Sequence, residues 1–437
     1  PVFGIKAIDT GSLKPRGTSR KHLDDLGHVV NHVVSICNAI HRRRVANSAD
    51  RRFLRTIVGL LRSMVDENHD VSLRDPRQIA QHFDLAFTRS MRQPGDRSMA
   101  LSSPFEYLSA EHIADDRLLV QIFAKSCPWL DKVAGPDPCL VTGPRGCGKS
   151  TIFRWLSLKA HLAQSSDALD SFKIAGFYIS CSTELQNRLG WITSEAQARR
   201  FRSEVVHYFN LLTTREIVDV LSLIAERPDR ESYWGFGVSQ ERSVHAWIID
   251  ALDAGGNMRL QGVPLLIQTR EIIERAMHRT HAQMLRGLNL ASTTPDTFLG
   301  DLTSLLVAEV PFFRIHRPTF LVDDFSIHRL SSHVQTILNR VIWERRPTHV
   351  FKLSSEKYGA VLTDSFNATA DLTREMVEID CGKEFIALDD AEQGRRGLTF
   401  AMELLDNRLR QAGYAATAEQ LIGRSKWEEG SLGMALA

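Results

Sequence analysis

The fold of this chain is decided by the stretch Gly143-Pro144-Arg145-Gly146-Cys147-Gly148-Lys149-Ser150-Thr151, which matches the phosphate-binding loop pattern G-x-x-x-x-G-K-[ST] at every fixed position. The apolar run 139–142 predicts the strand that leads into the loop, and the apolar spacing of 151–160 predicts the helix that follows. Glycines let backbone N–H groups converge on a polyphosphate, and the helix N-terminus adds partial positive charge. We therefore predict that residues 143–151 bind a nucleotide.

A second chemical landmark is the run Thr319-Phe320-Leu321-Val322-Asp323-Asp324, an apolar strand that ends in two acids. Downstream of a phosphate-binding loop this is the Walker B pattern. It predicts that Asp323 holds Mg²⁺ together with Ser150, and that Asp324 orients the attacking water. Lys149 is expected to reach the β- and γ-phosphates. The chain lacks an N-K-x-D guanine motif, so the expected cofactors are ATP and Mg²⁺.

Further apolar runs at 174–180, 349–353 and 376–380 predict three more strands, whereas 184–316 has mainly helical spacing. This indicates a large helical insertion between two strands of one sheet. A turn-rich linker at 92–104 separates it from the beginning of the chain. We expect three parts, listed in chain order: a mostly helical N-terminal domain of unknown role, residues 1–100; an ATPase domain, residues 105–382; and a helical lid, residues 383–437.

Charge and cysteine content limit the classes of function and partner that the chain can have. The net charge of +2 does not indicate nucleic-acid binding, but residues 1–60 hold eleven Lys or Arg against four acidic residues, a local charge of +7. The six cysteines are scattered without a C-x-x-C pair, which favours a reducing, cytoplasmic compartment and argues against a zinc module. No apolar run is long enough to span a membrane, so no membrane partner is expected.

Residues 105–423 resemble the bacterial ORC-like ATPases, relatives of the origin-recognition initiators within the AAA+ and STAND group. Besides the phosphate-binding loop, the resemblance rests on the block Leu321-Val322-Asp323-Asp324-Phe325 with Gln335, Asn339 and Phe351-Lys352, and on the tail Leu405-Asp406-Asn407-Arg408-Leu409 with Gly413-Tyr414 and Leu421-Ile422-Gly423. It implies an α/β fold: a five-stranded parallel P-loop AAA+ sheet with a large helical insertion and a small helical lid.

The resemblance also implies roles for residues that the motifs do not include. Ser354 and Ser355, at the end of the fourth strand, stand where such ATPases sense the γ-phosphate. Arg374 precedes the fifth strand, where the family has the arginine finger that completes a neighbour's site; Arg345 and Arg346 are rivals. The family usually has Glu in place of Asp324, and a shorter side chain holds water farther from the γ-phosphate. We therefore expect slow hydrolysis.

Three functions remain open from the sequence. The first is an ATP-driven switch that oligomerises and controls a partner or effector protein, in the antiphage or mobile-element systems to which the resemblance points. The second is a DNA-binding initiator or loader that uses the basic residues 1–60. The third is a scaffold that binds nucleotide without hydrolysing it.

Overall fold

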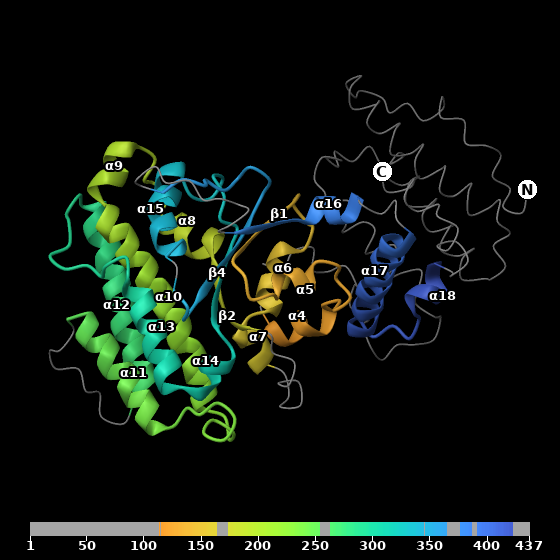
Figure 1. Ribbon diagram of the computed structural model, residues 1–437, viewed down its shortest axis with the longest axis horizontal. Helices are drawn as coiled ribbons and strands as arrows, with labels where there is room; N and C mark the ends of the chain where they lie inside the picture. The colour runs from red at the N-terminus through yellow and green to blue at the C-terminus, as the bar shows by residue number, and fades with distance from the viewer. Residues whose placement is uncertain are drawn as a thin grey trace, which may run out of the picture. The chain divides into compact units, whose positions relative to one another are not determined.

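The computed structural model describes residues 113, 115–163, 174–253, 263–344, 346–364, 376–386 and 391–422 (Figure 1). They belong to two units, one ending at Glu403 and one beginning at Leu404, and each is described by itself. The predicted N-terminal domain and the finger candidates Arg374 and Arg345 lie outside the described residues. Among the described helices, none is both long enough and apolar enough to cross a bilayer.

The described part contains one sheet of five parallel strands in the order β2-β3-β4-β1-β5. In chain order the strands are β1 (Cys139–Thr142), β2 (Ala175–Ser180), β3 (Pro318–Asp323), β4 (Val350–Ser355) and β5 (Val377–Asp380). This confirms the predicted AAA+ sheet. Because β3, β4 and β1 are parallel neighbours, their carboxyl ends lie side by side at one edge of the sheet. The two sequence motifs are thereby brought together.

The sheet is covered on both faces. All residues of β1, β3 and β4 are buried, as expected for parallel strands between helical layers. On one side of the sheet in Figure 1 lie the first helices, of which α6 contacts β2 and β3, and α7 contacts β2. These helices are α4 (Asp116–Ile122), α5 (Leu130–Val133), α6 (Lys149–Trp155) and α7 (Leu158–Leu162).

The other side carries the insertion between β2 and β3, which is helical as predicted (Figure 1). Its central helix, α10 (Arg202–Ala225), contacts β2, α12 (Leu265–Leu285) and α15 (Ser332–Ile342). The elements are the π-helix η4 (Cys181–Leu185), α8 (Gln186–Leu189), α9 (Glu195–Arg200), α10 (Arg202–Ala225), α11 (Val238–Ala251), α12 (Leu265–Leu285), α13 (Phe298–Glu309) and α14 (Pro311–Ile315). After β3 come α15 (Ser332–Ile342), α16 (Cys381–Ile386), α17 (Ala391–Gln411) and α18 (Ala418–Ile422).

Two helices have extents that apolar spacing does not show. Helix α10 runs unbroken through Thr213 and Thr214, whose hydroxyls donate to the carbonyls of Phe209 and Asn210 at 2.9 and 2.7 Å within the helix. The single helix expected over 151–160 is instead α6 and α7, because the Ser157 side chain caps α7 by accepting from the Ala160 N–H at 3.2 Å.

The unit that begins at Leu404 contains the end of α17, and α18. Leu409, Ala412 and Tyr414 form its small core. A capping box begins α18, since the Gln420 side chain accepts from the Thr417 N–H at 3.0 Å and Thr417 Oγ1 accepts from the Gln420 N–H at 3.2 Å.

Candidate nucleotide-binding site

The phosphate-binding loop has the backbone that its glycines permit. Gly146 and Gly148 have φ of +85° and +88°, a region that other residues rarely adopt. A Cβ at either position would meet no atom within 4 Å, so the two glycines border open space. Gly148 precedes Lys149, the first residue of α6. The loop and helix start therefore have the geometry of an anion cradle.

Lys149 is held by the loop itself. Its Nζ donates to the carbonyls of Gly143 at 2.8 Å and Pro144 at 3.0 Å, and lies 3.6 Å from Cys147 Sγ. The ammonium group thus has backbone acceptors that a polyphosphate oxygen can replace. The role of Lys149 at the β- and γ-phosphates stays a prediction.

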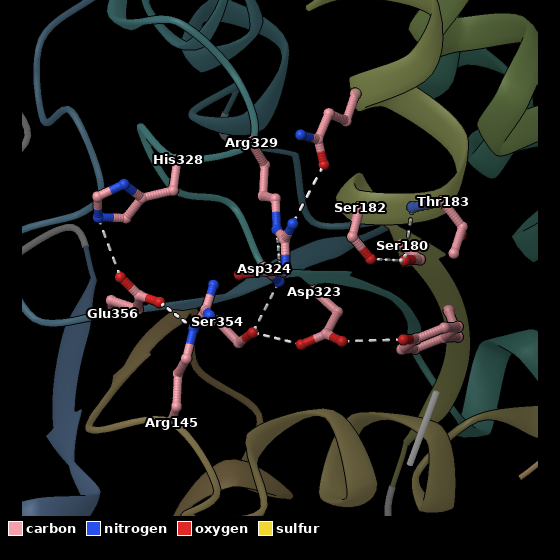
Figure 2. Close-up of polar contacts among 12 residues, drawn as sticks. Arg145, Ser180, Ser182, Thr183, Asp323, Asp324, His328, Arg329, Ser354 and Glu356 are labelled. Carbon is pink, nitrogen blue, oxygen red and sulfur yellow. Dashed lines mark hydrogen bonds and ion pairs between the residues drawn. The ribbon is translucent and has the colours of Figure 1, made fainter. Parts of the chain in front are cut away.

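Asp323 is the buried centre of the site, with 1% of its surface exposed. Its carboxylate accepts from Ser354 Oγ (Figure 2) and from Tyr178 Oη at 2.9 Å, and the nearby Ser150 hydroxyl also favours its charged form. Burial raises its pKa, whereas these hydrogen bonds oppose the rise and the neighbouring charge of Asp324 adds to it. A serine hydroxyl beside a carboxylate is the donor set that Mg²⁺ takes in such loops, with phosphate and water completing the shell. Ser150 and Asp323 therefore fit the predicted metal.

The two candidate sensors differ. The Ser354 hydroxyl donates to Asp323 and accepts from the Asp324 N–H at 2.9 Å, so it joins the two acids (Figure 2). Ser355 is also fully buried, but its hydroxyl has no hydrogen-bond partner and lies where a Cβ on Gly359 would meet it at 2.8 Å. Adjacent residues of a strand point to opposite faces. The structure brings Ser354 to the site and leaves Ser355 outside it.

Asp324 has a partner that the sequence did not indicate. It adopts a left-handed backbone, with φ of +59°, and its Oδ2 accepts from Arg329 Nε at 2.5 Å. Arg329 Nη1 also lies 3.3 Å from Gln186 Oε1, at the start of α8 (Figure 2). The carboxylate expected to orient water is therefore in an ion pair within its own chain, and the pair reaches the helical insertion.

A charged cleft borders the phosphate-binding loop. Arg145 Nε donates to Glu356 Oε1 at 2.8 Å, and His328 Nε2 lies 3.1 Å from Glu356 Oε2 (Figure 2). The cleft has a volume of about 760 Å³, within the range of small-molecule sites. Its lining comprises Gly143, Pro144, Arg145, His328, Glu356, Lys357, Asp380, Gly382 and Lys383.

Three buried polar residues that carry the resemblance, Asn339, Gln335 and Lys352, hold neighbouring backbone segments in place. Asn339 Nδ2 donates to the carbonyls of Val361 and Thr363, both at 2.8 Å, and the Gln335 side chain accepts from the Val361 N–H at 2.8 Å. They hold the segment after β4. Lys352 Nζ donates to the Gly135 and Asp137 carbonyls at 2.8 and 2.6 Å, which secures the chain just before β1.

Comparison with known proteins agrees with this geometry. A family model described as ORC-CDC6-like matches residues 103–432. No curated protein and no solved structure matches the chain. The matched span includes the phosphate-binding loop, both aspartates, β4 and the helices α16, α17 and α18.

Proposed function

The chain belongs to the ORC-CDC6-like family, and from this premise we propose that it is a switch that binds ATP with Mg²⁺, hydrolyses it slowly, oligomerises and controls a partner or effector protein in antiphage defence. Family membership makes it an AAA+ protein of the ATPase type. The antiphage setting comes from the resemblance of residues 105–423 to the bacterial ORC-like ATPases.

The observation that carries the proposal is the junction of Ser150, Asp323 and Ser354 at the ends of three neighbouring elements. One buried carboxylate accepts a hydrogen bond from Ser354 at the end of β4 and lies near the phosphate-binding loop's serine, which lowers its pKa. Bound Mg²⁺ would neutralise charge on the β- and γ-phosphates. A change at the γ-phosphate can therefore reach β3 and β4 through hydrogen bonds, which is what a nucleotide switch requires.

Slow hydrolysis is supported by the ion pair of Asp324. Its carboxylate must accept a hydrogen bond from water to orient the nucleophile, but Arg329 already occupies one carboxylate oxygen. The side chains are only 19% and 26% exposed, so the pair is poorly screened. Turnover in a single protomer is then low.

Dependence on assembly is supported by the cations near the site. Arg145 and Arg329 are each paired with a carboxylate, Glu356 and Asp324. Transition-state charge on the γ-phosphoryl group is commonly stabilised by an arginine from another protein, worth about 10³–10⁵ in rate. Arg374 of a neighbouring copy remains our proposed finger.

The test is ATP turnover per protomer across a wide range of protein concentration. We expect the rate to rise with concentration and to collapse in Lys149→Ala and Arg374→Ala. The exposed residues Lys132 and Arg199 provide matched controls, and Lys132→Ala and Arg199→Ala should retain the rate. Turnover that is independent of concentration and insensitive to Arg374→Ala would refute the shared site.

A second function, DNA binding by an initiator or loader, is favoured by the +7 charge of residues 1–60. Contacts with several phosphates would give duplex affinity that falls steeply and linearly on a log–log plot against salt. Turnover stimulated by duplex DNA, together with that slope, would favour the loader over the switch. ATP binding without turnover in any assembly would instead favour the non-hydrolysing scaffold.

A further inference from the structure

We propose that Cys147 and Cys381 form an oxidisable thiol pair, a modification site at which a peroxide makes a reversible disulfide that blocks the phosphate-binding loop. The two residues lie 234 positions apart in the sequence but side by side in the fold. Disulfide formation is independent of the proposed function, whereas its consequence for ATP rests on it.

The sheet register brings the two cysteines together. β1 and β5 are parallel neighbours with Thr142 paired to Asp380, so Gly143 and Cys381 leave the sheet at the same level. A Cβ on Gly143 would lie 2.9 Å from Cys147 Sγ and 3.0 Å from Cys381 Cβ. Both cysteines therefore border the space that this glycine leaves empty, and each thiol shifts the pKa of the other.

The surroundings activate one sulfur of the pair. The hydrogen bond from Cys381, opposed by burial and assisted by the charge of Lys149, lowers the pKa of Cys147 to about 6. The pKa of Cys381 is raised by the same hydrogen bond and by burial. Cys147 is partly exposed and Cys381 is fully buried. Cys147 is thus the nucleophile that solutes can reach, and Cys381 is the resolving thiol.

The chemistry needs only a peroxide. The Cys147 thiolate attacks one oxygen of hydrogen peroxide, the O–O bond breaks, and a sulfenic acid and hydroxide form. The Cys381 sulfur then attacks the sulfenic sulfur, the S–O bond breaks, and the departing hydroxide takes the Cys381 proton as water. In total, the Cys147 thiolate and the Cys381 thiol lose two electrons to one peroxide, which leaves as one water and one hydroxide; that hydroxide becomes water with the proton that Cys147 released on ionising.

A disulfide here would disturb phosphate binding. The S–S bond is about 2.05 Å long, so Cys147 must be drawn toward α16, and the neighbouring Gly146 and Gly148 with it. Binding groups must be held within about 0.5 Å of their working positions, so this movement lowers ATP affinity. Conversely, bound ATP would take Lys149 Nζ from its place 3.6 Å from Cys147 Sγ and bring negative charge near the sulfur. Both changes would reduce the thiolate fraction, so ATP should slow the oxidation.

The experiment treats the full chain with hydrogen peroxide, with and without ATP and Mg²⁺, then maps tryptic peptides without reduction. We expect the peptide 146–149 linked to 375–383, slower linkage with ATP, and at least about a tenfold loss of ATP affinity that dithiothreitol restores. Cys381→Ala should keep its ATP affinity after peroxide. Cys127→Ala is the matched control, because burial raises the pKa of that thiol to about 12, and it should behave as the wild type.

The outcomes separate the claims. A different linked pair, oxidation of Cys147 without linkage, or equal loss of ATP affinity in Cys381→Ala would overturn the thiol pair. Linkage with unchanged ATP affinity would overturn the block of the loop. Reduced protein that does not bind ATP at all would contradict the proposed function, while the peptide map still decides whether the disulfide forms.

Discussion

The Ser354→Ala substitution should destabilise the protein far more than Ser355→Ala. The two serines are neighbours at the end of β4, both fully buried, and each substitution removes one hydroxyl. They differ only in what the hydroxyl does. Ser354 Oγ joins Asp323 to the Asp324 N–H, whereas Ser355 Oγ has no hydrogen-bond partner.

The magnitude follows from the groups left behind. A buried backbone N–H without an acceptor costs about 1–3 kcal/mol, and a hydrogen bond to a charged group is worth about 1.5–3 kcal/mol. Since Tyr178 still donates to Asp323 at 2.9 Å, we expect the Ser354→Ala protein to lose about 3 kcal/mol of unfolding free energy. For a domain of this size that lowers Tm by about 6 °C. Ser355→Ala should change the unfolding free energy by less than about 1 kcal/mol, because it removes a hydroxyl that pairs with nothing.

The assay is urea denaturation at 25 °C followed by tryptophan fluorescence, with calorimetry for Tm and ATP turnover on the same preparations. Ser354→Ala should also lower Mg²⁺-dependent turnover, and Ser355→Ala should retain it. Equal losses of stability, or a larger loss in Ser355→Ala, would refute the assignment of the bridge to Ser354.

Three further outcomes are expected. Arg329→Ala should raise single-protomer turnover by about tenfold, equivalent to about 1.4 kcal/mol, by freeing Asp324; a rise that persists when Asp324→Asn is added would contradict this. Lys352→Met should lower the unfolding free energy in urea by about 2 kcal/mol, because two carbonyls before β1 lose their donor; a more stable variant would mean that burying the ammonium costs more than its bonds return. Burial lowers the pKa of His207 from 6.5 to about 4. Unfolding between pH 4 and 6.5 therefore takes up a proton at His207. The contribution of this residue to the unfolding free energy, about 3 kcal/mol, is present above pH 6.5 and lost as the pH falls toward 4. Melting curves of His207→Gln should lack that part of the acid sensitivity, and unchanged sensitivity would assign it to other groups.

Much of the fold could be predicted from local patterns. Each strand of the sheet is a short apolar run, and the glycines at 146 and 148 permit the positive φ values that they show. Motifs therefore located the phosphate-binding loop and the Walker B strand, and apolar spacing located the helical insertion. The helix ends were less predictable, since Ser157 starts a new helix through a side-chain cap that periodicity does not show.

The partners of the site could not be predicted in this way. Arg329 follows Asp324 by five residues, but only the left-handed turn at Asp324 brings their side chains together. Tyr178 lies 145 residues before Asp323 and reaches it because β2 and β3 are paired in register. Surface arginines and strand tyrosines are common, and neither position carries a sequence signal of its own.

By itself, the sequence determined which residues are the candidates for binding phosphate and metal, because that chemistry needs particular residue types in recognisable motifs. Tertiary structure decided which serine is hydrogen-bonded to both Asp323 and Asp324, which arginine forms an ion pair with Asp324, and which cysteine lies beside Cys147. Those choices depend on strand order and on the face to which each side chain points. Both follow from how the β-strands pack side by side, and one residue of shift along a strand reverses the face.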